Sequence, residues 1–77
     1  MKQQMSDITL HIDEETTHDE RESLRDNLLH LDGVMAADYH DNRPHLFVIE
    51  YDPEAINSMA FINVANNKGL HAELVGL

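Results

Sequence analysis

The sequence predicts an α+β domain in which two helices cover one face of a four-stranded antiparallel sheet. Strand-like and helix-like apolar patterns follow one another along the chain in the order β-α-β-β-α-β. The chain has 77 residues, a length at which a single small core built from whole secondary elements is expected.

The first strand and the first helix have the clearest patterns. Residues 8–13 alternate apolar and polar, which is typical of a half-buried strand. After an acidic loop, a helix is expected from about Thr17 to Leu31, because leucines recur there at i, i+4 and i+7. Thr17 and Glu20 fit the capping box that begins many helices, and Gly33 follows at a typical helix end.

The second half of the chain predicts a hairpin, a helix and a last strand. Residues 34–40 form a weaker strand pattern, residues 41–44 contain turn residues, and residues 46–51 form an almost continuous apolar run. A second helix is expected from an N-cap at Asn57 to about Lys68, followed by a strand over residues 70–75.

This order of elements indicates the ferredoxin-like βαββαβ sandwich. Two right-handed βαβ crossovers joined by a hairpin place both helices on one sheet face, with the strands in the order 4-1-3-2. The other face is then uncovered, and Thr9, His11 and Asp13 are expected on it. Residues 8–77 are expected to form one domain, and residues 1–7 a disordered tail.

Composition narrows the function classes. Fifteen acidic residues against five Lys and Arg give a formal net charge of −10, which disfavours nucleic acids and anionic membranes and favours a cation or a basic protein partner. A homodimer is the other partner expected, on the separate ground of the uncovered sheet face. The absence of cysteine excludes disulfides, thiolate metal sites and a cysteine nucleophile. No apolar run has the length of a signal peptide or membrane helix, so a soluble cytoplasmic domain is expected.

Catalytic motifs are also absent from the sequence. There is no glycine-rich phosphate loop and no serine placed beside a base and an acid. We therefore expect that the domain is not an enzyme.

Three short patterns have a familiar arrangement along the chain. They are leucines before a Gly-Val pair, a strand ending in Tyr-Asp-Pro, and a helix ending in Lys-Gly-Leu: Leu24, Leu28, Leu31, Gly33, Val34, Tyr51, Asp52, Pro53, Lys68, Gly69 and Leu70. Over about residues 8–75 this layout resembles the heavy-metal-associated (HMA) domain of copper and zinc chaperones and of P-type metal ATPases. The resemblance implies a ferredoxin-like fold and a function in metal-ion binding or transport.

The chain departs from that family at the metal-binding loop. The family binds metal with a Met-x-Cys-x-x-Cys loop, and the resemblance places Thr17 and Glu20 at the cysteine positions and Glu15 at the methionine position. Cu(I) prefers sulfur ligands, and the chain has no cysteine to supply a thiolate, so a Cu(I) thiolate site is excluded.

The residues that replace this loop allow two interpretations. His18, Asp19 and Glu20, together with Glu14 or Glu15, offer imidazole and carboxylate ligands that suit Zn(II), Ni(II), Co(II) or Cu(II). Alternatively, the segment is an ordinary helix start, capped by its threonine and glutamate, with a solvated histidine.

A second candidate metal site lies on the uncovered sheet face. His11 could approach His71 or Glu73 on one neighbouring strand and Glu50 on the other, which would give a divalent metal site or a pH-responsive patch. The alternative is an ordinary solvated sheet face. The other three histidines are interpreted as surface residues: His30, His40 and His45.

The same face is a candidate interface. If the alternate residues of their strand pack under the helices, Leu46 and Val48 point to the uncovered face, where they either pair with Val75 or bind a partner. This supports a second hypothesis, a metal-free interaction or regulatory module, with an ACT-like small-ligand regulator as a more distant option because it shares the element order.

Overall fold

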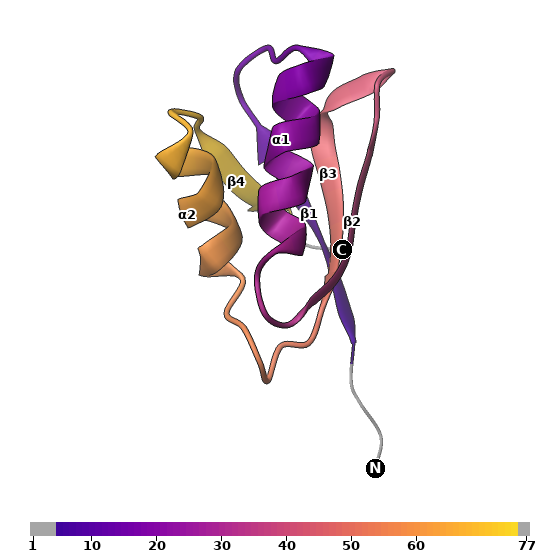
Figure 1. Ribbon diagram of the computed structural model, residues 1–77, viewed down its shortest axis with the longest axis vertical. Helices are drawn as coiled ribbons and strands as arrows, with labels where there is room; N and C mark the ends of the chain where they lie inside the picture. The colour runs from indigo at the N-terminus through magenta and orange to yellow at the C-terminus, as the bar shows by residue number, and fades with distance from the viewer. Residues whose placement is uncertain (1–4, 76–77) are drawn as a thin grey trace.

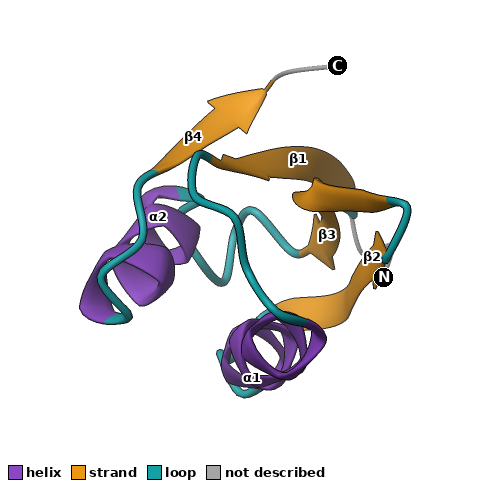
Figure 2. Ribbon diagram, turned by 90° about the horizontal axis from the view of Figure 1, so that it is seen from above, coloured by secondary structure: helices purple, strands orange, loops and turns teal. Residues whose placement is uncertain are grey.

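The computed structural model describes residues 5–75 and contains four strands and two helices. In chain order they are β1 (Ser6–Ile12), α1 (His18–Leu29), β2 (Val34–His40), β3 (Arg43–Tyr51), α2 (Met59–Asn67) and β4 (Ala72–Val75). The strands form one antiparallel sheet in the order β2-β3-β1-β4. Both helices lie on the same side of this sheet (Figures 1 and 2). The predicted ferredoxin-like sandwich and its strand order are therefore confirmed.

The core lies between the sheet and the helices. Leu10 and Phe47 are opposite each other on β1 and β3 and are fully buried. From the helix layer, Leu24 and Phe61 are also fully buried, and the Phe61 ring packs edge-on against Tyr51 at 5.1 Å between centroids. Because strand side chains alternate, the residues between these core positions point to the uncovered face.

Several element boundaries differ from those expected. β1 begins at Ser6, so Ser6 and Asp7 belong to the strand and not to the tail, whereas residues 1–4 of that tail lie outside the described residues. β3 begins at Arg43, three residues earlier than expected, because it continues its pairing with β2 beyond an irregularity next to the turn.

The second helix is shorter than its sequence pattern indicates. Its N-cap is Ser58 and not Asn57, although the Asn57 side chain accepts a hydrogen bond from the Met59 N–H at 2.8 Å. At the other end, the N–H of Leu70 donates to the Ala65 carbonyl, so Leu70 belongs to the helix cap and β4 begins only at Ala72.

Among the residues described, α1 and α2 are the helices, and neither is long and apolar enough to cross a membrane.

The predicted capping box at the start of α1 is present. The Thr17 hydroxyl accepts a hydrogen bond from the Glu20 N–H at 3.1 Å, and the Glu20 carboxylate accepts one from the Thr17 N–H at 2.7 Å. Two backbone N–H groups that the helix leaves without partners are thereby satisfied.

Gly33 joins α1 to β2 at a point where two loops touch. Its φ is +99°, and a Cβ there would lie 2.9 Å from the Ala55 Cβ and 3.0 Å from the Ile56 Cγ2. Its carbonyl also accepts a hydrogen bond from the Asp52 N–H at 2.8 Å. Both the backbone conformation and the close approach therefore require glycine.

We predict that Thr17→Ala lowers the free energy of unfolding by about 1 kcal/mol, because it removes the side chain that caps the Glu20 N–H. Glu20→Gln is the matched control, since glutamine can still accept the reciprocal bond, and it should change stability by only a few tenths of a kcal/mol. Urea unfolding followed by circular dichroism measures both values. Equal losses in the two variants would contradict the capping assignment.

We predict that Gly33→Ala destabilises the fold by about 2–4 kcal/mol, through the left-handed φ and the contact with the 55–56 segment. Gly69→Ala is the control, because Gly69 also has a positive φ of +79° but has no atom within 4 Å of the added Cβ. The free energy of unfolding of Gly69→Ala should fall by only about 1–2 kcal/mol. Chemical denaturation gives the difference, and similar losses at both positions would show that the close approach is unimportant.

Candidate metal centre

The three loop residues proposed from the sequence as metal ligands do not come together. Glu20 is engaged in the capping box, Asp19 is exposed, and the His18 Nδ1 lies 3.0 Å from the Asp41 Oδ1 in the β2–β3 turn. Within residues 5–75 these side chains form no cluster of three ligand atoms. The loop has the geometry of a capped helix start.

A buried arginine stands behind this loop. The Arg21 guanidinium donates to the Thr16 carbonyl at 2.5 Å and to the Asp41 carboxylate at 3.1 Å, and it lies over the Tyr39 ring at 5.7 Å from the centroid. Its fixed positive charge already satisfies Asp41 and would repel a cation placed in the loop. This group, made of Arg21, Thr16, Asp41 and Tyr39 with His18, is called the arginine cluster below.

Protonation equilibria reflect the contacts of the arginine cluster. Hydrogen bonding to Asp41 raises the pKa of His18, and the same bond, together with the one from Arg21, lowers the pKa of Asp41. Burial, followed by the hydrogen bond that the Tyr39 hydroxyl donates to Glu22, raises the pKa of Tyr39 to about 12. The arginine cluster is thus held together by ion pairs and hydrogen bonds within the chain.

His71 is not part of the sheet-face group expected from the sequence. Its Nδ1 lies 2.5 Å from one oxygen of Glu14, and its N–H donates to the other at 2.8 Å. The His71 carbonyl accepts from the Asp13 N–H at 2.9 Å. These bonds join the β1–α1 loop to the start of β4 and hold the imidazole against Glu14, and His71 is not one of the residues whose ligand atoms cluster with His11.

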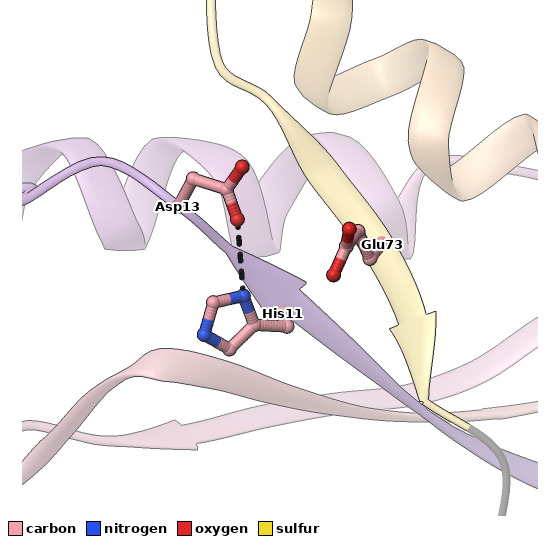
Figure 3. A group of neighbouring side chains, drawn as sticks. All are labelled: His11, Asp13 and Glu73. Atoms are coloured by element: carbon pink, nitrogen blue, oxygen red, sulfur yellow. Dashed lines mark ion pairs between the residues drawn. The ribbon is translucent and has the colours of Figure 1, made fainter.

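The residues that do come together on the open face are His11, Asp13 and Glu73, shown in Figure 3. His11 lies opposite Glu73 in the β1–β4 ladder, and Asp13 follows two positions after His11. One ligand atom from each residue lies within 4.8 Å of the others, and the His11 Nδ1 is 3.3 Å from the Asp13 Oδ1. We call these three residues the sheet-face triad.

Two features of the sheet-face triad bear on metal binding, and one residue expected beside it lies elsewhere. The His11 Nδ1 is enclosed, and its 3.3 Å contact with the Asp13 Oδ1 does not have hydrogen-bond geometry, so that among the described residues no hydrogen bond satisfies this nitrogen. One imidazole and two carboxylates are ligands that suit Zn(II), Ni(II), Co(II) or Cu(II) better than Cu(I). Glu50, the third expected neighbour of His11, lies opposite Asp7, four residues along the strand or about 13 Å away.

A second imidazole next to the triad was not expected from the sequence. The His45 ring stacks on His11 with 5.7 Å between centroids and 16° between planes. The His45 Nδ1 lies 2.6 Å from the Ile12 carbonyl oxygen, to which it donates as Nδ1–H. In the neutral ring, this tautomer leaves the Nε2 lone pair available to a ligand. His45 was expected only as a surface residue near the hairpin, but it is half-buried and contacts β1, because β3 extends back past it.

We predict a pH dependence from the His71–Glu14 pair. The hydrogen bond to Glu14 raises the pKa of His71 above 6.5, and the bond from His71 lowers the pKa of Glu14 below 4.5. The histidine's contribution to stability is therefore complete below pH 6.5 and is lost as the pH rises through its folded-state pKa. The glutamate's contribution is complete above pH 4.5 and is lost on acidification.

Glu14→Gln should return the pKa of His71 towards 6.5, as measured by NMR titration of its ring protons. Glu15→Gln is the control, since in the described part of the chain Glu15 makes no hydrogen bond to His71. A His71 midpoint that is unchanged in Glu14→Gln would contradict the assignment.

Comparisons with known proteins bear on the fold of this chain. No protein-family model matches the sequence, and no curated protein matches it either. Among solved structures, a copper-binding domain from HMA7, a P-type ATPase, superposes with a TM-score of 0.80 at 17% identity, covering 91% of this chain and 93% of that one. Oxidized MerP from Ralstonia metallidurans CH34 superposes with a TM-score of 0.82 at 13% identity, covering 92% of this chain and 97% of that one.

Both solved structures align over more than nine-tenths of each chain, so the likeness concerns the fold as a whole. At these identities the likeness concerns the backbone arrangement and not the ligands. The chain therefore has the fold of the HMA7 copper-binding domain and of MerP, with no cysteine in its sequence.

Proposed function

We propose that this domain binds a divalent metal ion and acts in metal-ion handling, as a cysteine-free relative of HMA domains and not as an enzyme. The observation that carries the proposal is the sheet-face triad, where His11, Asp13 and Glu73 bring three ligand atoms within 4.8 Å of one another. In this proposal, imidazole and carboxylate ligands on the sheet replace the thiolate loop that the HMA resemblance implies.

Two further observations support this proposal. The fold is shared with a copper-binding domain. Together with the HMA resemblance of the sequence, this shared fold supports the proposal of a metal-related function. The net charge of −10 attracts cations to the protein surface at low ionic strength. The cytoplasmic location expected from the sequence belongs to the same proposal.

The sheet-face triad predicts modest affinity. Closed structural zinc sites have four protein ligands, whereas His11, Asp13 and Glu73 supply three on an exposed face, with His45 as the adjacent candidate for a fourth. Asp13 has 52% of its side chain exposed, so that water competes with it for the ion. The proposed ion therefore exchanges readily, as carriage of a metal would require.

The loop site is the competing location within the same proposal. To bind an ion together with Asp19, Glu20 would have to leave the capping box and His18 would have to leave the arginine cluster. This cost favours the sheet-face triad.

We predict that Zn(II), Ni(II), Co(II) and Cu(II) shift or broaden the side-chain resonances of His11 and His45, whereas Cu(I) leaves them unchanged. NMR correlation spectra of the ring nitrogens, recorded through a titration, measure this. Resonances that are unchanged at several-fold excess of every divalent ion would overturn the proposal. Shifts confined to His18 would place the metal in the loop.

Substitutions sharpen the same test. His11→Ala should weaken Zn(II) binding about tenfold or more in calorimetry, because it removes the one imidazole of the triad. His30→Ala is the control, since His30 caps the end of α1 in the helix layer, and it should leave the affinity unchanged. Equal effects of the two substitutions would indicate nonspecific binding to an acidic surface.

A further inference from the structure

The centre of the open sheet face carries an apolar strip. Val48 and Val75 lie on either side of Thr9 in the β3-β1-β4 ladders, and 48% and 45% of their surfaces are exposed. Leu46 lies opposite His11 in the next row, on the same face. Isolated exposed valines are ordinary, but here two of them flank a threonine in one row that crosses three strands.

A hollow of about 190 Å³ extends this strip towards β2. It is lined by residues of three strands: Thr9, Asp38, Tyr39, His40, Arg43, Leu46 and Val48. The face is therefore shaped to take a side chain next to its apolar centre.

Carboxylates surround the strip. Asp7 and Glu50 lie opposite each other on one side of it, Asp38 lies beyond Val48 on the edge strand, and Glu73 lies with Asp13 on the other side. All five side chains are exposed. Among the residues described, Arg43 at the hairpin end is the basic side chain of this face.

We infer that the open face docks a basic amphipathic helix of another protein. Its apolar side would cover Val48, Thr9 and Val75, and its flanking Lys and Arg side chains would meet the surrounding carboxylates. The valine-bearing strands are two sheet spacings apart, or about 10 Å, which matches the width of one helix with its side chains.

Charge argues against a second copy as the occupant. Stacking two of these faces would bring together two rings of carboxylates, and the whole chain already has a net charge of −10. Like charges placed directly opposite each other disfavour such an interface. A cationic helix removes this repulsion and also steers the encounter.

The probe is an amphipathic peptide of leucine and lysine with a length of about 18 residues, or five helical turns. All measurements are made with a chelator present, so that they are independent of metal binding. Backbone resonances of the open face, including Val48 and Val75, should shift on addition of the peptide. A peptide of the same pattern with glutamate in place of lysine should cause no shift.

Substitutions identify the surface. Val48→Ser and Val75→Ser should each weaken peptide binding about three- to tenfold. About half of each valine's surface is exposed in the free protein, and each substitution removes apolar surface that the peptide would cover. Met59→Ser is the control, since Met59 is 54% exposed on α2, on the opposite layer, and it should have no effect. Circular dichroism shows whether each variant remains folded.

A charge-matched pair of double variants tests the carboxylate ring. Asp38→Asn with Glu50→Gln should weaken binding and reduce its salt dependence, whereas Asp19→Asn with Asp26→Asn on α1 removes the same charge and should change little. Equal losses in both double variants, or shifts that map to the helices, would overturn the inference. A concentration-dependent dimer without peptide, seen by sedimentation, would also overturn it and assign the face to self-association.

Discussion

One-sided burial of the sheet is the constraint on which the other features depend. Leu10, Ile12 and Phe47 are fully buried between the sheet and the helices, and the register of β1 with β3 follows from placing them there. Because strand side chains alternate, a shift of one residue would expose this core. The same register puts Thr9 and His11 on the open face, where the proposed metal site and the proposed docking surface lie next to each other.

The loop between β1 and α1 has a structural role in this chain. Thr17 and Glu20 satisfy the helix start, and Arg21 lies behind them with hydrogen bonds to Thr16 and Asp41. A buried guanidinium is stable only with such partners, so the arginine cluster ties α1 to the β2–β3 turn. The position at which the HMA resemblance would place a metal is thus occupied by internal contacts of the protein.

Much of the fold could be predicted from the sequence, because apolar periodicity and the capping signals agree with one another. The capping box and the outward position of His11 were predictable on local grounds. The partners of His11 were not, since they depend on register across strands and on where each strand begins. Pro44 and the turn residues before it concealed the early start of β3, and with it the approach of His45 to His11.

X-ray absorption of the zinc-loaded protein would show whether a divalent ion binds the sheet-face triad. We expect nitrogen and oxygen neighbours at about 2.0–2.2 Å with imidazole scattering, and weaker imidazole scattering in His11→Ala. A spectrum of zinc surrounded by water alone would rule out binding at the triad. So would a spectrum that is unchanged in His11→Ala but altered in His18→Ala.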